Sequence, residues 1–397
     1  MLVIIALAVF WYGLVPVAGA FVNRRNWRLF RRRFDDLCLK PFLDYAACGR
    51  DDGGIYRFIG GFESITGGHT IWIRNEELTI PVSLDDAYIY VLSMPQKDEP
   101  SWGFTPGNET PVRIKWDHIT ALTEEAKIFV GGALMLKDNR MTFCSEQGNP
   151  LLVIFYEGPD RSLAGRIIRA GRDSNEYWNF LTPYALTLGS LSQLTIAMNF
   201  VNRPAYMLTA ITAFLAVFIP LFPMAPPGFA LTILYKRLWW YARIFRVYRD
   251  LTRLPLKYLP SGGLPGPEGR KLLDEQNQGR LPDGERYECV YFQSLPGEAK
   301  DAMENMRLKL LVPEKKVDRR GGWYIFGAPP ENGCAGALPG EPRDVFAPYA
   351  AVPGNPDDLS RGFTYKAYIL EMSAWIALLA GICLNIAAAG IVIVVLN

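Results

Sequence analysis

Few residues in this chain are of the types that carry out catalysis at neutral pH. It has two histidines, His69 and His118, and six cysteines without a C-x-x-C pair. Zinc sites and nucleophile–base pairs both require imidazole or thiolate groups placed close together. His118 lies in an alternating segment, which is typical of a structural histidine on a strand. We therefore predict no catalytic residue, no metal site and no cofactor, and we favour a protein that is not an enzyme.

Two other patterns resemble ligand sites but lack the required order. Residues 262–271 are glycine-rich and end in lysine, but the G-x-x-x-x-G-K-[ST] order of a phosphate-binding loop is absent. The acidic pairs at residues 51–52, 85–86 and 357–358 lack the alternating oxygen donors of a calcium loop. A linker explains the glycine-rich segment, and turns explain the acidic pairs.

Arginines beside apolar segments are the strongest functional signal. Residues 1–22 are uncharged and mostly apolar, long enough to cross a hydrocarbon layer of ~30 Å as a helix. The arginines that follow are Arg24, Arg25, Arg28, Arg31, Arg32 and Arg33. Because such charge marks the cytoplasmic side, we predict an outer N-terminus. The small residues at 17–20 allow a cleaved signal peptide as the alternative, but signal peptides carry their charge before the apolar stretch.

A second basic segment, residues 236–253, interleaves arginines with tryptophans and tyrosines. At about 100° per residue, one helical face carries Lys236, Arg243, Arg246 and Arg253. Such a helix lies naturally at a membrane surface with its cations toward acidic phosphates. We therefore predict an interfacial helix that binds anionic headgroups through these residues and through the first arginine cluster.

Three further segments are apolar enough to suggest spans. Residues 180–201 and 205–235 would form a helical pair, the second broken by prolines, and residues 367–396 would form a C-terminal span. A soluble helix at 180–201 and a single bent crossing at 206–235 are the alternatives. The C-terminal segment repeats small or polar residues at i+4. This pattern is typical of a helix-packing face, but because alanine and glycine are common in spans, a chance origin is an equal alternative. This stripe is Ser373, Ala377, Gly381, Asn385 and Ala389.

Between the spans we expect two cytoplasmic blocks. Residues 23–178 contain several alternating segments, typical of a small barrel or sandwich, either OB-like or PH-like. A hairpin turn is expected at residues 137–140, a buried strand at 151–156, and a bulge or bend at Gly131-Gly132. Residues 254–365 are rich in glycine and proline, and we expect them to pack on the first block.

The fold class expected is therefore an α+β integral membrane protein with about four transmembrane helices and a β-rich cytoplasmic module. We expect a non-catalytic scaffold or assembly factor in a bacterial inner membrane, with both termini outside and free cysteine thiols. Its expected partners are anionic lipid headgroups and another membrane protein or a second copy of the chain; a net charge of +2 gives no field that would recruit nucleic acid. A membrane enzyme or transporter subunit, using Gln193, Asn199, Glu371 and Asn385, and a sensor of a cytoplasmic ligand are the alternatives.

Overall fold

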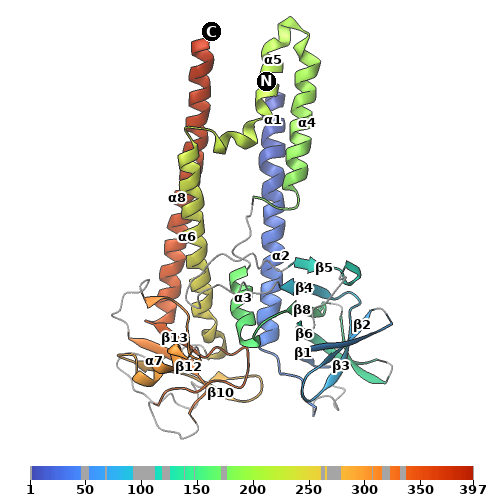
Figure 1. Cartoon of the computed structure of the whole chain (residues 1–397), viewed down its shortest axis with the longest axis vertical. Helices are drawn as coiled ribbons and strands as arrows, with labels where there is room; N and C mark the ends of the chain where they lie inside the picture. The colour runs from blue at the N-terminus through green and yellow to red at the C-terminus, as the bar shows by residue number, and fades with distance from the viewer. Residues whose placement is uncertain are drawn as a thin grey trace. The chain divides into compact units, whose positions relative to one another are not determined.

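The chain is a mixed α+β protein with two compact units. The computed structural model describes residues 2–45, 53–67, 69–92, 112–118, 126–137, 139–146, 148–170, 177–260, 264–265, 279–305, 307–314, 322–330 and 337–396. Unit 1 comprises Met1–Leu29, Ser174–Phe245 and Tyr365–Asn397, and unit 2 comprises Phe30–Asp173 and Arg246–Thr364. In the described residues unit 1 is built from helices, whereas unit 2 carries both β-sheets (Figure 1).

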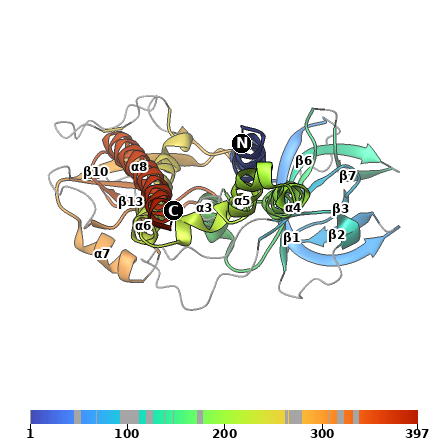
Figure 2. The same cartoon turned by 90° about the horizontal axis from the view of Figure 1, so that it is seen from above.

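Three of the helices of unit 1 extend beyond its boundaries, so that one end of each belongs to unit 2. The helices are α1 (Leu2–Val9), a π-helical turn (Phe10–Leu14), α2 (Val15–Cys38), α4 (Thr182–Val201), α5 (Met207–Ala216), a 3₁₀ segment (Ile219–Met224), α6 (Phe229–Arg253) and α8 (Pro356–Leu396). The three that extend are α2, α6 and α8. Seen from above, α4 and α5 lie beside α1 (Figure 2). Many large apolar side chains on these helices are exposed, among them Leu188, Ile211, Trp375 and Ile376.

Two described helices are long and apolar enough to cross a membrane, so the expectation of four spans is wrong. They are Leu2–Cys38 and Pro356–Ala388. α5 has ten residues and is therefore only about 15 Å long. α4 has twenty residues, but serines, threonines, Gln193 and Asn199 dilute its apolar content. α5 therefore fails by its length and α4 by its composition to match the span that was expected of it.

The prolines after α5 interrupt the helix where the sequence predicts a break. α5 ends at Ala216, and α6 begins only at Phe229, because each proline between them removes a backbone donor. The basic segment that we expected to be a separate interfacial helix is instead the continuation of α6 through Arg253. Its buried face includes Ala242, Val247 and Leu251.

The first block of unit 2 folds into an eight-stranded sheet that closes on itself in part. The strands are β1 (Ile55–Thr66), β2 (Thr70–Arg74), β3 (Thr79–Ser83), β4 (Tyr88–Leu92), β5 (Val112–Ile114), β6 (Lys127–Lys137), β7 (Arg140–Cys144) and β8 (Leu152–Tyr156). Their order is β1-β2-β3-β7-β6-β8-β4-β5, and β1 also pairs with β6. The pairings therefore run in a closed circuit through β1, β2, β3, β7 and β6, with β3 and β7 parallel.

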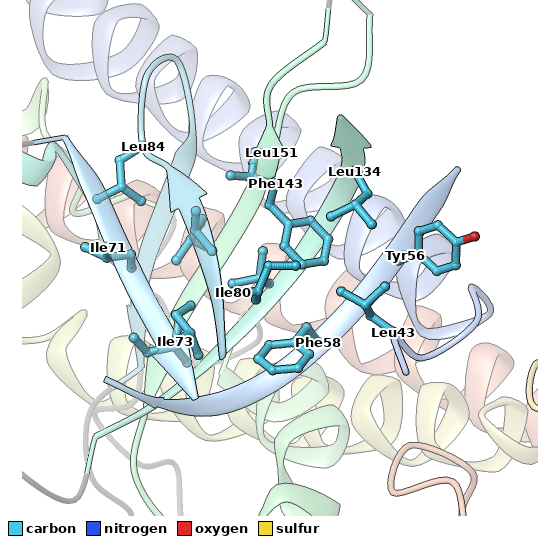
Figure 3. Close-up of a cluster of buried hydrophobic side chains, with 14 of the residues drawn as sticks. Leu43, Tyr56, Phe58, Ile71, Ile73, Ile80, Leu84, Leu134, Phe143 and Leu151 are labelled. Atoms are coloured by element: carbon cyan, nitrogen blue, oxygen red, sulfur yellow. The ribbon is translucent and has the colours of Figure 1, made fainter. Parts of the chain in front are cut away.

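A continuous apolar core fills this circuit. Alternating residues such as Ile71 and Ile73 on β2 point to one side and are fully buried, as expected for period-two patterning. Phe58, Phe143 and Leu134 meet them from the other strands (Figure 3). The buried strand expected at residues 151–156 is present as β8, and the hairpin expected around residue 139 joins β6 to β7.

Gly131 and Gly132 do not form the predicted bulge. Both lie in regular register opposite Arg57 and Tyr56 of β1. A Cβ at Gly131 would lie 2.6 Å from Leu37 Cδ1, and one at Gly132 would lie 2.5 Å from Leu151 Cδ1. The glycines therefore provide space for neighbouring side chains, while the irregularity lies in β1, between Phe62 and Ser64.

The second block forms a smaller sheet in the same unit. Its order is β11-β13-β12-β10-β9. The strands are β9 (Gly279–Arg280), β10 (Arg286–Phe292), β11 (Lys309–Leu310), β12 (Trp323–Gly327) and β13 (Ala350–Pro353). Helix α7 (Gly297–Glu304) follows β10, and α3 (Leu163–Ala170) follows β8. Phe326, Tyr287 and Val352 centre one core cluster of this block.

Replacing Gly131 with valine should destabilise unit 2. The added branches collide with buried Leu37, and overpacking of this kind costs about 1–3 kcal/mol. Thermal unfolding of the full chain in detergent, followed by tryptophan fluorescence, measures the change. Gly165→Ala is the matched control, because nothing lies within 4 Å of that position and alanine favours the helix. Equal melting curves for Gly131→Val and wild type would contradict this packing role.

Candidate functional site

Unit 1 contains polar contacts where the first long helix is interrupted. Pro16 has no N–H, so the carbonyl of Tyr12 loses its usual partner four residues ahead. The Val15 N–H reaches back to the Phe10 carbonyl, which is the five-residue bond of a π-turn. The Tyr177 hydroxyl donates to the Tyr12 carbonyl at 3.1 Å. The acceptor freed by the proline is thus bonded by a side chain from a distant segment.

Asn179 binds the same turn of the helix. Its Nδ2 donates to the Pro16 carbonyl at 2.8 Å, and its Oδ1 accepts from the Leu181 N–H at 3.0 Å. A Cβ at Gly19 would lie 2.1 Å from Asn179 Oδ1, so glycine is required for this approach. Asn179 therefore fixes the start of α4 against Pro16.

α4 then runs antiparallel to α1. The hydroxyls of Ser190 and Tyr12 lie 3.3 Å apart, and Gln193 Nε2 donates to the Ile4 carbonyl at 2.9 Å. Gln193 Oε1 is buried without a hydrogen-bond partner among the described residues. The turn after α4, at Arg203, consequently lies at the same end of unit 1 as the N-terminus. Asn199, another polar candidate from the sequence, is exposed.

Asn385 of α8 bonds the break between α5 and α6. Its Oδ1 accepts from the Gly228 N–H at 2.7 Å, and its Nδ2 donates to the carbonyls of Phe222 at 2.5 Å and Ala225 at 3.1 Å. Both amide hydrogens and one oxygen lone pair are therefore used. Thr232 Oγ1 adds a bond to the Pro223 carbonyl at 2.5 Å. Polar groups outside regular helix must be bonded inside the protein if lipid surrounds it.

Two members of the predicted small-residue stripe of α8, Gly381 and Asn385, meet the start of α6 or the break before it. A Cβ at Gly381 would lie 3.2 Å from the Gly228 carbonyl, so the two backbones approach closely beside Asn385. Ala377 is buried, and Ser373 is half-buried. The side chain of Ala389 lies outside the described residues. A packing role for the whole stripe stays a prediction.

Aromatic and basic side chains gather farther along α6 and α8, within unit 1. The ring centroids of Trp239 and Trp375 are 6.0 Å apart, and Arg243 Cζ lies 5.8 Å from the centroid of Trp239. Lys366 Nζ lies 5.9 Å from the Phe245 centroid. Tryptophans flanked by cations are enriched where helices leave the hydrocarbon for water.

The cations that we predicted to face lipid differ in how exposed they are in the structure. Those that are exposed are Arg24, Arg25, Arg28, Arg32, Lys236 and Arg253, and those that are half-buried are Arg31, Arg33, Arg243 and Arg246. Arg31 Nη1 donates to Asp250 Oδ2 at 2.6 Å, and Arg33 Nη2 donates to Asn149 Oδ1 at 3.1 Å. These two residues therefore have protein partners, on α6 and in the loop between β7 and β8. Lipid binding by the others stays a prediction.

A buried ion pair joins the two blocks inside unit 2. Arg57 of β1 donates through Nη1 to Asp344 Oδ1 at 3.0 Å and through Nη2 to Oδ2 at 2.5 Å. Each side chain is 2% exposed. The Phe346 N–H donates to the same Asp344 Oδ1, and Arg57 Cζ lies 5.0 Å from the Phe346 ring centroid. Neither sequence pattern nor spacing singled out these residues, which are 287 positions apart.

Other polar contacts surround this pair. Lys257 Nζ lies 2.6 Å from Asp35 Oδ2, and Tyr258 OH donates to the Phe346 carbonyl at 3.2 Å. Burial raises the pKa of the Tyr258 phenol. Arg253 Nε donates to Ser360 Oγ at 2.6 Å, linking the ends of α6 and α8. The expectation that the second block packs on the first agrees with these contacts.

The residues considered for catalysis do not converge on one place. His69 Nδ1 lies 4.0 Å from Asp85, and both side chains are exposed. Cys38, Cys144, Cys289 and Cys383 are free thiols, as expected, and burial raises the pKa of Cys289. Among the described residues no group of three metal-ligating side chains occurs. The acidic pair at 51–52 and nearly all of 262–271 lie outside the described residues.

In comparisons with protein-family models, with curated proteins and with solved structures, nothing matches this chain.

Asn385→Leu should weaken the contact between α8 and the helix break. Three bonded backbone groups lose their partner, and leaving such groups unsatisfied costs about 1–3 kcal/mol. Thermal unfolding in detergent measures the loss. Asn199→Leu removes an exposed asparagine of the same size and should change stability by less than about 0.5 kcal/mol. If both variants melt alike, Asn385 does not bond the break.

Arg57→Met should destabilise unit 2 strongly, because it leaves the Asp344 carboxylate buried and unpaired. Loss of one partner of a buried pair costs about 3–5 kcal/mol. Arg57→Met with Asp344→Asn removes that charge and keeps an acceptor for the Phe346 N–H, so the double variant should be more stable than Arg57→Met. Arg74→Met tests an exposed pair, with Arg74 and Glu63 4.0 Å apart, and should cost less than about 1 kcal/mol. A double variant no more stable than Arg57→Met would refute this account.

Proposed function

We propose that this protein is a non-catalytic membrane scaffold that presents a β-rich module at the cytoplasmic face of a bacterial inner membrane. The observation that carries the proposal is the buried pair of Arg57 and Asp344. It joins an eight-stranded and a five-stranded sheet into one unit, to which α2, α6 and α8 each contribute a helical end. A recognition module requires such rigidity more than it requires reactive groups.

The sheet circuit supports an OB-like module. A long first strand pairs with both its sequence neighbour and β6, while β3 and β7 run parallel. This closed order matches the five-stranded OB barrel better than the PH-like alternative. The fold does not itself specify a ligand.

The distribution of charge supports a cytoplasmic location for unit 2. The helices that lead from unit 1 toward unit 2 carry Arg24, Arg25, Arg28, Lys236 and Lys366. At the opposite end, Arg203 is the charged residue in the turn between α4 and α5. Positive charge accumulates on the cytoplasmic side of spans. The two long apolar helices then cross with the N- and C-terminal ends outside, and their exposed basic residues face anionic headgroups.

Thiol labelling in intact cells tests this orientation. Arg203→Cys should react with an impermeant maleimide, whereas Lys300→Cys on α7 should react only after the cells are opened, because both positions are exposed and the proposed topology assigns them to opposite sides of the membrane. Native Cys289 is unsuitable as a reporter because it is buried. The parent for both variants replaces Cys48, Cys144, Cys334 and Cys383 with serine. Labelling of Lys300→Cys in intact cells would invert the topology and reject the cytoplasmic module.

A scaffold should be isolated together with its partner. Mild detergent extraction followed by native mass spectrometry should detect a second membrane protein or a second copy of this chain in fixed stoichiometry. A chain that is monomeric and without a protein partner under these conditions would count against the scaffold function.

A transporter or enzyme subunit is the second candidate, and Gln193 is the observation that favours it. Its Oε1 is a buried acceptor without a partner among the described residues, within the contact between α1 and α4. Gln193→Leu should leave the isolated assembly intact if this residue serves transport or turnover. Loss of the assembly would instead give Gln193 a structural role and favour the scaffold.

A further inference from the structure

Three basic residues from two distant segments of unit 2 gather at one place. Arg161 lies in the 3₁₀ turn Asp160–Ser162 before α3, and Arg169 lies in the last turn of α3. Lys309 belongs to β11, in the other sheet. Lys309 Nζ donates to the backbone carbonyl of Arg161 at 3.2 Å, across 148 residues of sequence. The fold thus holds the ammonium against the turn that carries Arg161.

The positive charge at this cluster exceeds the negative charge. Within the described part of the chain, Arg161 forms an ion pair with Glu341 and also donates to the Pro342 carbonyl at 3.3 Å. No ion pair is found for Arg169 or Lys309 in that part. Burial, followed by repulsion from Arg161 and then Arg169, lowers the pKa of Lys309, and the attraction of Glu341 is the smallest contribution. The ammonium therefore experiences a net positive field.

An anion can reach this place. Lys309 as a whole residue is exposed although its ammonium packs against the carbonyl of Arg161, and the side chains of Arg161 and Glu341 are 39% and 40% exposed. Arg169 is also exposed, on the solvent side of α3. A guanidinium offers paired N–H donors that match a phosphate group, and an ammonium adds a point charge. A doubly charged phosphate would offset the surplus charge of the cluster.

We propose that Arg161, Arg169 and Lys309 form a binding site for a phosphate-bearing anion. Glu341 orients Arg161 and keeps its guanidinium at the rim of the site. The same chemistry would accept a soluble phosphate or the headgroup of an anionic phospholipid. The site is independent of the proposed scaffold function, since it requires only the fold of unit 2.

Calorimetric titration of the full chain in phosphatidylcholine nanodiscs with inorganic phosphate tests the site. The wild type should bind, and Lys309→Met and Arg169→Gln should each bind at least about tenfold more weakly, the effect of losing one charge-assisted hydrogen bond. Lys309→Arg keeps the charge and should retain most of the binding. Lys300→Met removes an exposed lysine on α7 and should bind like the wild type. Thermal melts establish that each variant is folded.

Two results would overturn the proposal. One is a wild type that binds no phosphate at millimolar concentration, and the other is binding that Lys309→Met and Arg169→Gln leave unchanged. A parallel titration with short-chain phosphatidylglycerol distinguishes the sources. Tighter binding of the lipid, lost in the same variants, identifies a headgroup site. Tighter binding of inorganic phosphate identifies a site for a soluble ligand.

Discussion

The buried pair of Arg57 and Asp344 is the interaction on which unit 2 depends. Removing two charges from water is costly, and the cost is offset only where the geometry is good and the remaining hydrogen-bonding groups have partners. Here the guanidinium contacts both carboxylate oxygens and the Phe346 N–H donates to Asp344 Oδ1, while Arg57 Nε is buried without a hydrogen-bond partner among the described residues. Without the second block the charge of Arg57 would lose its partner, and without the first block the charge of Asp344 would lose its partner. The glycine-rich second block therefore packs on the first through this pair and through the contact of Phe346 with Phe129.

A second constraint acts in unit 1, where each proline interruption frees backbone groups. At Pro16 the Tyr177 hydroxyl bonds the freed Tyr12 carbonyl and Asn179 bonds the adjacent Pro16 carbonyl, and at the break before α6 Asn385 bonds the backbone groups. Asparagine suits this position because one amide both donates and accepts. Asn179 and Asn385 are therefore explained by the interruptions, whereas Gln193 of α4 bonds the Ile4 carbonyl away from both of them.

Local patterns in the sequence predicted local structure well, and tertiary relationships poorly. A continuous apolar run identified the buried strand β8, and the prolines identified the break before α6, since both signals depend on adjacent residues. The number of spans was wrong because apolar length does not reveal that α5 ends after ten residues. A bulge or bend was predicted at Gly131, and the bulge is absent; the sequence does not show that Leu37 packs against this glycine. The pairing of Arg57 with Asp344 was not predicted, because the two residues are 287 positions apart and only the tertiary structure brings them together.

The arginines of α2 show why charge pattern alone cannot assign a role. Arg24 and Arg31 are seven residues apart and therefore lie on nearly the same helical face. Arg24 is exposed, whereas Arg31 donates to Asp250 of α6. The bond to Asp250 makes Arg31 a structural contact between α2 and α6. The arginine cluster of α2 thus combines charges available to a membrane surface with charges that hold α2 to α6, and only the tertiary structure distinguishes the two.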